Sequence, residues 1–427
     1  MSWKKFLLSI NSIGILLLWM GPPLIYFIKS LVMPNAGSLF TGVFYLFGII
    51  LMVNSINAKI GFIPNMHLLL YGGVFFIISQ CYLICYNHEP QNFSADILNL
   101  FLITLYIFYL LKTESNIKHI LPFWIFVFTL IINICLIYSI YNNPMYVLGA
   151  RATVQFGTDQ FTGNPYIFAR NGFAGFIISY LLIKFRFKSN LLTSNFFTQF
   201  FCYFNIWLSL VVIFLTQTRT IFLSFILILI PLFFFVRGNK EKSDSSYFSI
   251  PLILFYSMFS ILLVYFNNIF NIFDFVSNSF THAIEIFTNA IDTGINMGAN
   301  VQDESAMGRV GGIKIMLSTI AERPEFLFTG GGYRFLYMDI PFLEAIINFG
   351  FFSFFFYLIF QIYLFKHAIY AIFSHDILQV FLGFMSFQIL IAIFTTGRCL
   401  DFSYWISYAI LIRFFENDFP IFKSKID

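Results

Sequence analysis

Long apolar runs recur along almost the whole chain, and they constrain its fold more than any other feature. Stretches such as 208–215 and 221–236 carry only a single serine each among apolar residues. Hydrophobic residues make up 59% of the 427 residues and charged residues only 10%, which is too little polar surface to cover a water-soluble globule. A helix needs about 20 apolar residues to cross the hydrocarbon core of a bilayer. The sequence therefore predicts a membrane protein.

The spans are predicted to be helices, because barrel strands would alternate apolar and polar positions, whereas these runs are apolar on both faces. We predict an all-α integral membrane protein, a single polytopic membrane domain over 1–427, with roughly twelve transmembrane helices. The first apolar stretch runs to Ile28 without a small-residue cleavage site, so we expect a span and not a signal peptide. The predicted spans are 6–28, 39–56, 67–86, 96–111, 120–141, 166–183, 198–215, 220–236, 247–267, 339–365, 376–396 and 401–415.

Basic residues give the predicted orientation. With the N-terminus in the cytoplasm, fifteen of the 24 lysines and arginines fall on the cytoplasmic side, as the positive-inside rule requires. Both termini are then cytoplasmic. Lysine dominates that side, whereas the outer side carries mostly arginine, whose planar fork matches carboxylate and phosphate oxygens. The outer arginines, which we interpret as anion-binding residues, are Arg151, Arg170, Arg219, Arg309, Arg323, Arg334 and Arg398.

Two outer segments are long enough to build a site. The first outer loop covers 142–165, and a large outer loop covers 267–338. In the large loop, apolar residues at helical spacing over 272–291 predict a helix lying in the membrane interface. A second amphipathic helix is predicted from near Arg309 to just before Pro324.

Arg219 and Arg309 are the strongest anion-binding candidates in these outer segments. Arg219 lies in a hairpin between two spans, and Arg309 opens a helix whose N-terminal amides favour an anion. Such groups suit a pyrophosphate and can neutralise a leaving group without a metal. The alternative is that Arg219 reaches the lipid headgroups and that Arg309 only makes the loop helix soluble.

Asp339, where the large loop re-enters the membrane, is the candidate general base, because a carboxylate there could accept the proton of an acceptor hydroxyl. The alternative is a helix N-cap ahead of Pro341. No phosphate-binding loop, zinc motif or Asp-x-Asp pair is present. We therefore expect no metal, no cofactor and no nucleic-acid partner.

Several short motifs, in their order along the chain, resemble the O-antigen polymerase and ligase superfamily. The C-terminal part of the resemblance consists of Gly308-Arg309 before an amphipathic helix, Thr329-Gly-Gly-Gly-Tyr333, Asp339 and Asn348-Phe-Gly350. Arg151 with Gly163-Asn-Pro165 and Ala169-Arg-Asn171 is similar to the first conserved loop of that family, and Thr216-Gln-Thr-Arg-Thr220 is similar to its hairpin.

This resemblance implies a GT-C-like, metal-independent glycosyltransferase at the periplasmic face of a bacterial inner membrane. Its substrates would be glycans on undecaprenyl pyrophosphate, polymerised into O-antigen, capsule or a similar polysaccharide, with a chain-length regulator and a flippase as further partners beside membrane lipids. Asp339, Arg309 and Arg219 would be catalytic. The pyrophosphate contacts would be Arg151, Arg219, Arg309, Arg334 and Arg170.

Two other functions are open. An O-antigen ligase would transfer the glycan to lipid A-core, but that branch has a histidine where this chain has Tyr337 and Asp339. A lipid-linked oligosaccharide flippase should show paired halves and charged residues deep in several spans. The predicted spans are nearly free of charge, which favours the enzyme.

Overall fold

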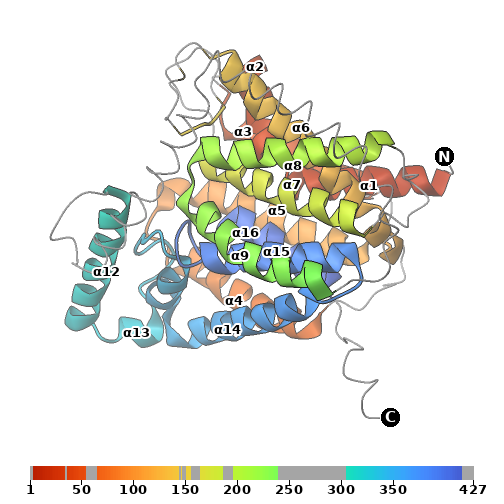
Figure 1. Ribbon diagram of the computed structural model, residues 1–427. Helices are drawn as coiled ribbons and strands as arrows, with labels where there is room; N and C mark the ends of the chain where they lie inside the picture. The colour runs from red at the N-terminus through yellow and green to blue at the C-terminus, as the bar shows by residue number, and fades with distance from the viewer. Residues whose placement is uncertain are drawn as a thin grey trace. The chain divides into compact units, whose positions relative to one another are not determined.

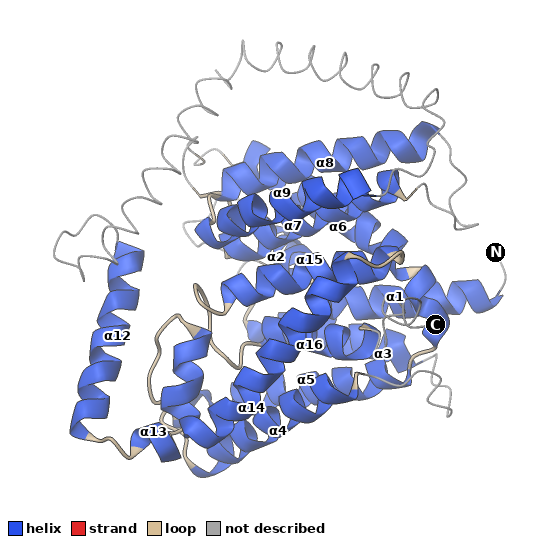
Figure 2. Cartoon of the chain, turned by 60° about the horizontal axis from the view of Figure 1, so that its bottom comes forward, coloured by secondary structure: helices blue, strands red, loops and turns tan. Residues whose placement is uncertain are grey.

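The computed structural model describes residues 3–33, 36–53, 65–143, 146, 151–154, 164–185, 196–238 and 304–415. Every regular element in this part of the chain is a helix (Figure 2). Six of these helices are long and apolar enough to cross a membrane, or up to seven if one sharply bent pair forms a single span. The all-helical prediction is confirmed for the described residues, and helices of membrane-spanning length and composition are present.

The predicted spans coincide with helices wherever the structure describes them. The predicted span 247–267, the interfacial helix over 272–291, the end of the predicted span 39–56 and most of the first outer loop, with Gly163, lie outside the described residues. The matching helices are α3 (Ser38–Val53), α4 (Met66–Cys85), α5 (Phe93–Lys112), α6 (Leu121–Tyr141), α7 (Pro165–Lys184), α8 (Phe196–Thr216), α9 (Arg219–Gly238), α14 (Pro341–Ile372), α15 (Ile377–Ala392) and α16 (Phe402–Phe414).

The first predicted span differs, because it is not one straight helix. It consists of α1 (Trp3–Trp19) and α2 (Pro22–Val32), which meet at 79°. Proline has no amide hydrogen and its ring clashes with the preceding turn, so consecutive prolines after Gly21 end one helix and begin another. A Cβ on Gly21 would also collide with the backbone of Leu17.

The described helices group into two compact units. Unit 1 comprises 1–48 and 118–285, and unit 2 comprises 49–117 and 286–427. In unit 1, α6, α7 and α8 pack against one another (Figure 1). Gly172 and Gly175 allow this close approach, because a Cβ at either position would press against α8.

A buried polar network joins the three central helices of unit 1. The Asn133 side chain donates to Asn205 Oδ1 and Ser209 Oγ, both at 3.0 Å, and Asn171 donates to Asn133 Oδ1 at 3.0 Å. Polar side chains between apolar helices find their partners on neighbouring helices. This network therefore fixes the packing of α6, α7 and α8.

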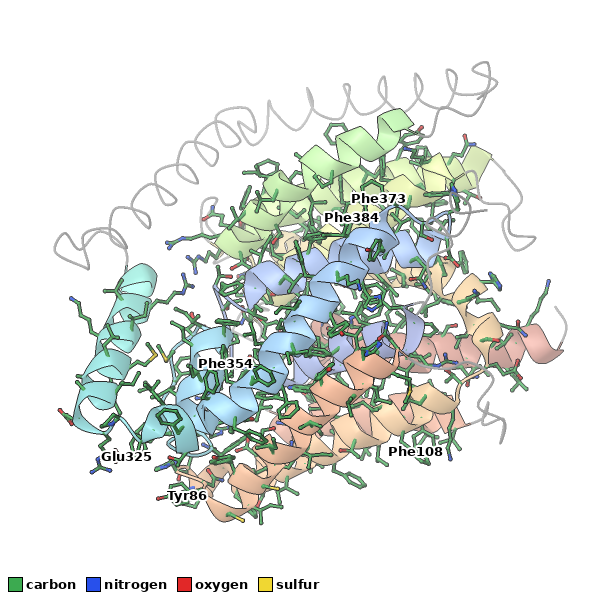
Figure 3. The ribbon with its side chains drawn as sticks, turned by 90° about the horizontal axis from the view of Figure 1, so that it is seen from below. Tyr86, Phe108, Glu325, Phe354, Phe373 and Phe384 are labelled. Atoms are coloured by element: carbon green, nitrogen blue, oxygen red, sulfur yellow. The ribbon has the colours of Figure 1, made fainter. Side chains whose placement is uncertain are left out.

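Unit 2 is built around an aromatic core between α4, α14 and α16. Phe75 and Trp405 are fully or almost fully buried and stack with ring centroids 6.1 Å apart, and Tyr357 lies 4.7 Å from Phe75. The helices of this unit run between two ends: Tyr86 and Glu325 lie at one, and Phe108 and Phe373 at the other (Figure 3).

Arg413 of α16 links two helices at the end of unit 2 that carries Phe108 and Phe373. This end is predicted to be cytoplasmic. The Arg413 guanidinium is almost fully buried and donates to the carbonyl oxygens of Leu110 and Thr113, at 3.0 and 2.7 Å. These carbonyls end α5, where a positive charge is favourable.

The opposite end of unit 2 carries the remaining helices, α12 (Glu304–Glu322) and α13 (Phe326–Thr329). A helix is thus present where the sequence predicts one around Arg309. It begins at Glu304, however, so Arg309 lies in its second turn, and the prediction that Arg309 opens the helix beside its free N-terminal amides is wrong. Met316 of α12 forms a small core with Met338 and Ile347.

Candidate functional site

The Gly-rich loop 329–333 packs against a break in α14. Gly350 has φ 73° and interrupts the helix, which frees carbonyl oxygens in the preceding turn. The amide of Gly331 donates to Ile347 O at 2.8 Å, and that of Gly332 donates to Asn348 O at 2.9 Å. Two separate motifs, 329–333 and 348–350, are therefore one structural feature, which we call the glycine clip.

Glycine is required in the clip for two reasons. Gly330 and Gly350 both have φ near +74°, a conformation that other L-residues rarely adopt. A Cβ on Gly330 would also clash with the backbone of Asn348, and a Cβ on Gly350 would clash with the carbonyl of Phe328.

The Asn348 side chain holds the segment that follows the clip. Its Oδ1 accepts from the amide of Leu336 at 3.0 Å, and its Nδ2 donates to the carbonyl of Leu336 at 3.1 Å. Both hydrogen-bonding groups of one residue are therefore fixed to a helix. This contact sets the path of the segment that carries Arg334, Tyr337 and Asp339.

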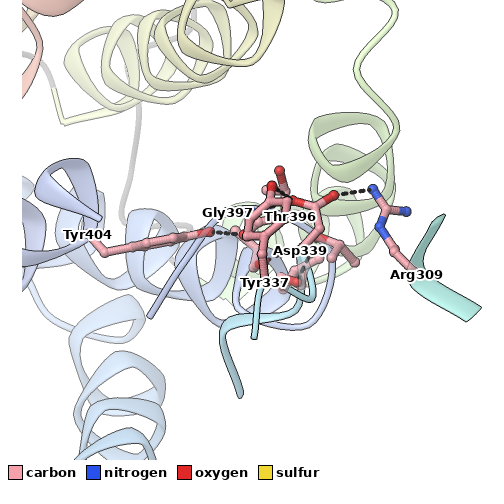
Figure 4. Close-up of polar contacts among 9 residues, drawn as sticks. Arg309, Tyr337, Asp339, Thr396, Gly397 and Tyr404 are labelled. Carbon is pink, nitrogen blue, oxygen red and sulfur yellow. Dashed lines mark hydrogen bonds and ion pairs between the residues drawn. The ribbon is translucent and has the colours of Figure 1, made fainter. Parts of the chain in front are cut away.

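Asp339 lies at the centre of a polar cluster (Figure 4). Its Oδ1 accepts from the amide of Gly397 at 2.8 Å and from the hydroxyl of Tyr337 at 3.1 Å, and its Oδ2 lies 3.4 Å from Nη2 of Arg309. Burial, with the charge of Asp339 adding to it, raises the pKa of Tyr337 to about 12, so this phenol keeps its proton and donates. Two of the predicted catalytic residues, Arg309 and Asp339, thus form an ion pair.

The alternative interpretation of Asp339 as the N-cap of α14 is wrong. Helix α14 begins at Pro341, its N-cap residue is Ile340, and no side chain caps it. Because proline has no N–H group, Pro341 leaves the start of α14 with one amide fewer that a capping side chain could accept from. The carboxylate turns instead to the amide of Gly397.

Arg334 is held between two carboxylates, one in the loop after α4 and one in the first turn of α5. It pairs with Glu89 and, at 2.6 Å, with Asp96, whose side chain is only 4% exposed. Burial lowers the pKa of the Arg334 guanidinium, but the hydrogen bonds to Asp96 and Glu89 outweigh it and raise the pKa above its usual value. A hydrogen bond from Asn92, then the one from Arg334, lowers the pKa of Glu89.

A cavity of about 90 Å³ lies behind these groups, within unit 2. Arg398 lines it and places its guanidinium over the Tyr337 ring, 4.7 Å from the centroid. Among the described residues, no carboxylate lies within ion-pair distance of this arginine. The charged residues that line it are Asp96, Arg334, Glu344, Arg398 and Asp401, and Asn348 is among its polar residues.

The other predicted site residues belong to unit 1. Arg219 begins α9, directly after a hairpin in which Gln217 has φ 47°. Arg151 is exposed, and the amide of its neighbour Ala152 donates to Leu215 O at 2.9 Å. Unit 1 therefore brings the Arg151 segment to the end of α8 from which the Arg219 hairpin starts. Arg170 is half-buried on α7.

Sequence reasoning missed the carboxylates Glu89, Asp96 and Asp401, and it named Arg398 only as one of the outer arginines, without selecting it for the site. A signal was present, because Asp96 and Asp401 each open a predicted span at its outer end. Alternating spans bring such ends to one side of the membrane.

No group of histidine, cysteine and acidic residues in the described part of the chain could hold a metal ion.

No protein-family model matches the chain, and no curated protein matches it significantly.

Proposed function

We propose that the protein polymerises undecaprenyl-pyrophosphate-linked repeat units into a surface polysaccharide by metal-independent glycosyl transfer. The proposal includes a GT-C-like bundle of about twelve spans in a bacterial inner membrane, with cytoplasmic termini and a site facing the periplasm. It rests on the resemblance of the motifs and on one structural observation. That observation is that the Gly-rich motif and the Asn348-Phe-Gly350 motif form one clip, beside the Arg309–Asp339 pair.

The Arg309–Asp339 pair is suited to exchange with a substrate anion. Its side chains are 25% and 29% exposed and 3.4 Å apart, and exposed ion pairs contribute only about 0.2–1 kcal/mol. A charged hydrogen bond to a phosphate oxygen contributes about 1.5–3 kcal/mol. The pyrophosphate would therefore replace Asp339 at part of the guanidinium, and Asp339 would keep Arg309 oriented.

Arg398 joins Arg309 as a proposed pyrophosphate contact, whereas Arg334 takes a structural role. Arg398 has no carboxylate within ion-pair distance among the described residues, while Arg334 already pairs with Glu89 and Asp96. Arg151, Arg170 and Arg219 remain proposed contacts from unit 1.

The test measures polymer in the host. The gene is deleted, variants are supplied in its place, and the length of the polysaccharide is compared with that made by the wild type. Arg309→Ala should leave only single repeat units, and Arg309→Lys should rescue poorly, because lysine lacks the bidentate fork. The matched control is Arg323→Ala. The sequence groups Arg323 with the outer arginines, but in the structure it is exposed, its guanidinium lies over the Phe326 ring, 5.6 Å from the centroid, and it does not line the cavity; this variant should keep full polymer. Full polymer from both Arg309→Ala and Arg398→Ala would overturn the proposal, and so would a loss of purified activity in EDTA.

The ligase alternative has a different deletion phenotype. Loss of a polymerase leaves single repeat units on the lipid A-core, and loss of a ligase leaves none. A gel of the lipopolysaccharide from the deletion strain separates the two functions.

A flippase is favoured by one observation, namely that Asp96 and Glu344 are buried within spanning helices. Intramembrane carboxylates are common in proton-coupled transporters. A flippase predicts that lipid-linked units accumulate on the cytoplasmic side after deletion, whereas a polymerase predicts that they accumulate outside.

A further inference from the structure

The cavity of unit 2 carries more carboxyl groups than guanidinium groups. Asp96, Glu344 and Asp401 line it together with Arg334 and Arg398. A pyrophosphate would be repelled from the carboxyl side, so the cavity suits a neutral group that donates hydrogen bonds. Its volume of about 90 Å³ holds a few waters or the edge of one sugar ring.

Glu344 is the carboxyl of the three without a strong partner. Asp96 pairs with Arg334 at 2.6 Å, and Asp401 accepts from the amide of Arg398 at 2.8 Å. Glu344 is only 3% exposed, and its Oε1 receives one long hydrogen bond, 3.4 Å, from Nδ2 of Asn348. Its buried Oε2 has no hydrogen-bond partner among the described residues.

Such an orphaned oxygen is costly to maintain. A buried polar group without a hydrogen bond loses its hydration without compensation, and an ionisable residue at membrane depth is a functional candidate by default. The Asn348 side chain makes its shorter hydrogen bonds to Leu336, at 3.0 and 3.1 Å, and only its long one, 3.4 Å, to Glu344. The Oε2 atom therefore has the features of an acceptor for a ligand.

We propose that the cavity binds the attacking hydroxyl of the acceptor sugar and that Glu344 is the catalytic base; this inference rests on the proposed glycosyl transfer. The hydroxyl proton passes to Oε2 of Glu344 while the hydroxyl oxygen forms a bond to the anomeric carbon of the donor. The bond from that carbon to the pyrophosphate oxygen breaks, and the leaving oxygen keeps the electron pair. Arg309 and Arg398 neutralise the departing charge.

Asp339 is less suited to this role. Its two carboxylate oxygens already face three donors, from Arg309, Tyr337 and Gly397. A group with occupied lone pairs has to break a contact before it accepts a proton. Asp339 is therefore a positioning residue for Arg309, and Glu344 is the base.

The experiment uses purified full-length protein and separates binding from turnover. Binding is measured as the rise in melting temperature on adding undecaprenyl pyrophosphate. Turnover is measured with the lipid-linked repeat units that accumulate in the deletion strain. The variants are Glu344→Gln, Glu344→Asp and Arg309→Ala, and Glu322→Gln, an exposed glutamate on α12, is the matched control.

Glu344→Gln should lower turnover about 100- to 10,000-fold, the usual contribution of a general base, and should keep the thermal shift. Glu344→Asp should retain intermediate turnover, and Glu322→Gln should resemble the wild type. Wild-type turnover in Glu344→Gln would overturn the inference. Should that variant fail to accumulate, wild-type turnover in Glu344→Asp would overturn it equally, because the shorter side chain withdraws the carboxyl from the cavity.

The two proposals fail in different ways. If Arg309→Ala loses both thermal shift and turnover while Glu344→Gln keeps both, only the assignment of Glu344 is wrong. If Arg309→Ala and Glu344→Gln both form polymer at the wild-type rate, the glycosyl-transfer proposal itself is wrong.

Discussion

Arg309 and Arg334 differ in how deeply the carboxylates that pair with them are buried. Asp96, which pairs with Arg334, is almost fully buried, whereas Asp339, which faces Arg309, is 29% exposed. Removing one partner of a buried pair leaves an uncompensated charge, whereas an exposed pair contributes little. The arginine type alone predicted a common anion-binding role, because the sequence does not show which carboxylates fold against each guanidinium.

Arg334→Ala should destabilise the protein by about 3–5 kcal/mol, because it leaves Asp96 buried and unpaired. Melting temperatures in detergent measure this effect. Adding Asp96→Asn should recover much of the loss, since the orphaned charge is then removed. Arg323→Ala, at an exposed site, should change stability by less than about 0.5 kcal/mol. A melting temperature unchanged by Arg334→Ala would contradict the structural role of the pair.

Asp339→Asn tests the positioning role at the other pair. The amide keeps the shape of the side chain but removes the charge that faces Arg309, so donor affinity should fall while the protein remains folded. The rise in melting temperature with undecaprenyl pyrophosphate measures that affinity. An unchanged thermal shift would show that Arg309 needs no orientation by Asp339.

At the scale of elements, apolar runs predicted where the helices lie, because a segment in lipid has to satisfy its own backbone hydrogen bonds. The ends are less accurate, since α14 continues to Ile372 and not to 365. The break at Gly350 was not predicted. It lies in a largely apolar run, and the carbonyls it frees accept hydrogen bonds from Gly331 and Gly332, which lie outside that run. The residues Gly21-Pro22-Pro23 indicate a bend between two helices, but the continuous apolar run led to the prediction of a single span.

Gly350→Ala should disrupt the glycine clip, because alanine disfavours φ 73° and its Cβ collides with Phe328 O. A loss of about 1–3 kcal/mol is expected from the backbone conformation alone. Gly311→Ala is the matched control: a Cβ added to this helical glycine would meet nothing within 4 Å, so alanine should stabilise α12 by about 0.5–1 kcal/mol. Equal melting temperatures for the two variants would contradict the clip.

At the scale of the whole molecule, the alternation of predicted spans agrees with the contacts inside unit 2. Segments assigned to the outer side meet at one end, where Arg334 contacts Glu89 and Asp339 contacts Gly397. Segments assigned to the cytoplasmic side meet at the other, where Arg413 contacts Thr113. Orientation across the membrane rests on the positive-inside rule alone.

Reporter fusions test this orientation. Alkaline phosphatase joined after Glu89 or Arg398 should be active, and a fluorescent protein joined after Thr113 or Ser374 should fluoresce, because each reporter works on only one side of the membrane. Fluorescence from the Glu89 and Arg398 fusions would put the arginine cluster in the cytoplasm and exclude lipid-linked periplasmic substrates.

The glycine clip holds its loop through main-chain amides and carbonyls of Gly331, Gly332, Ile347 and Asn348. Main-chain bonds specify where the loop runs without specifying which side chains it carries. Substitutions of Arg334 or Tyr337 should therefore change the polar contacts around Asp96 and Asp339 while the backbone of the loop keeps its path.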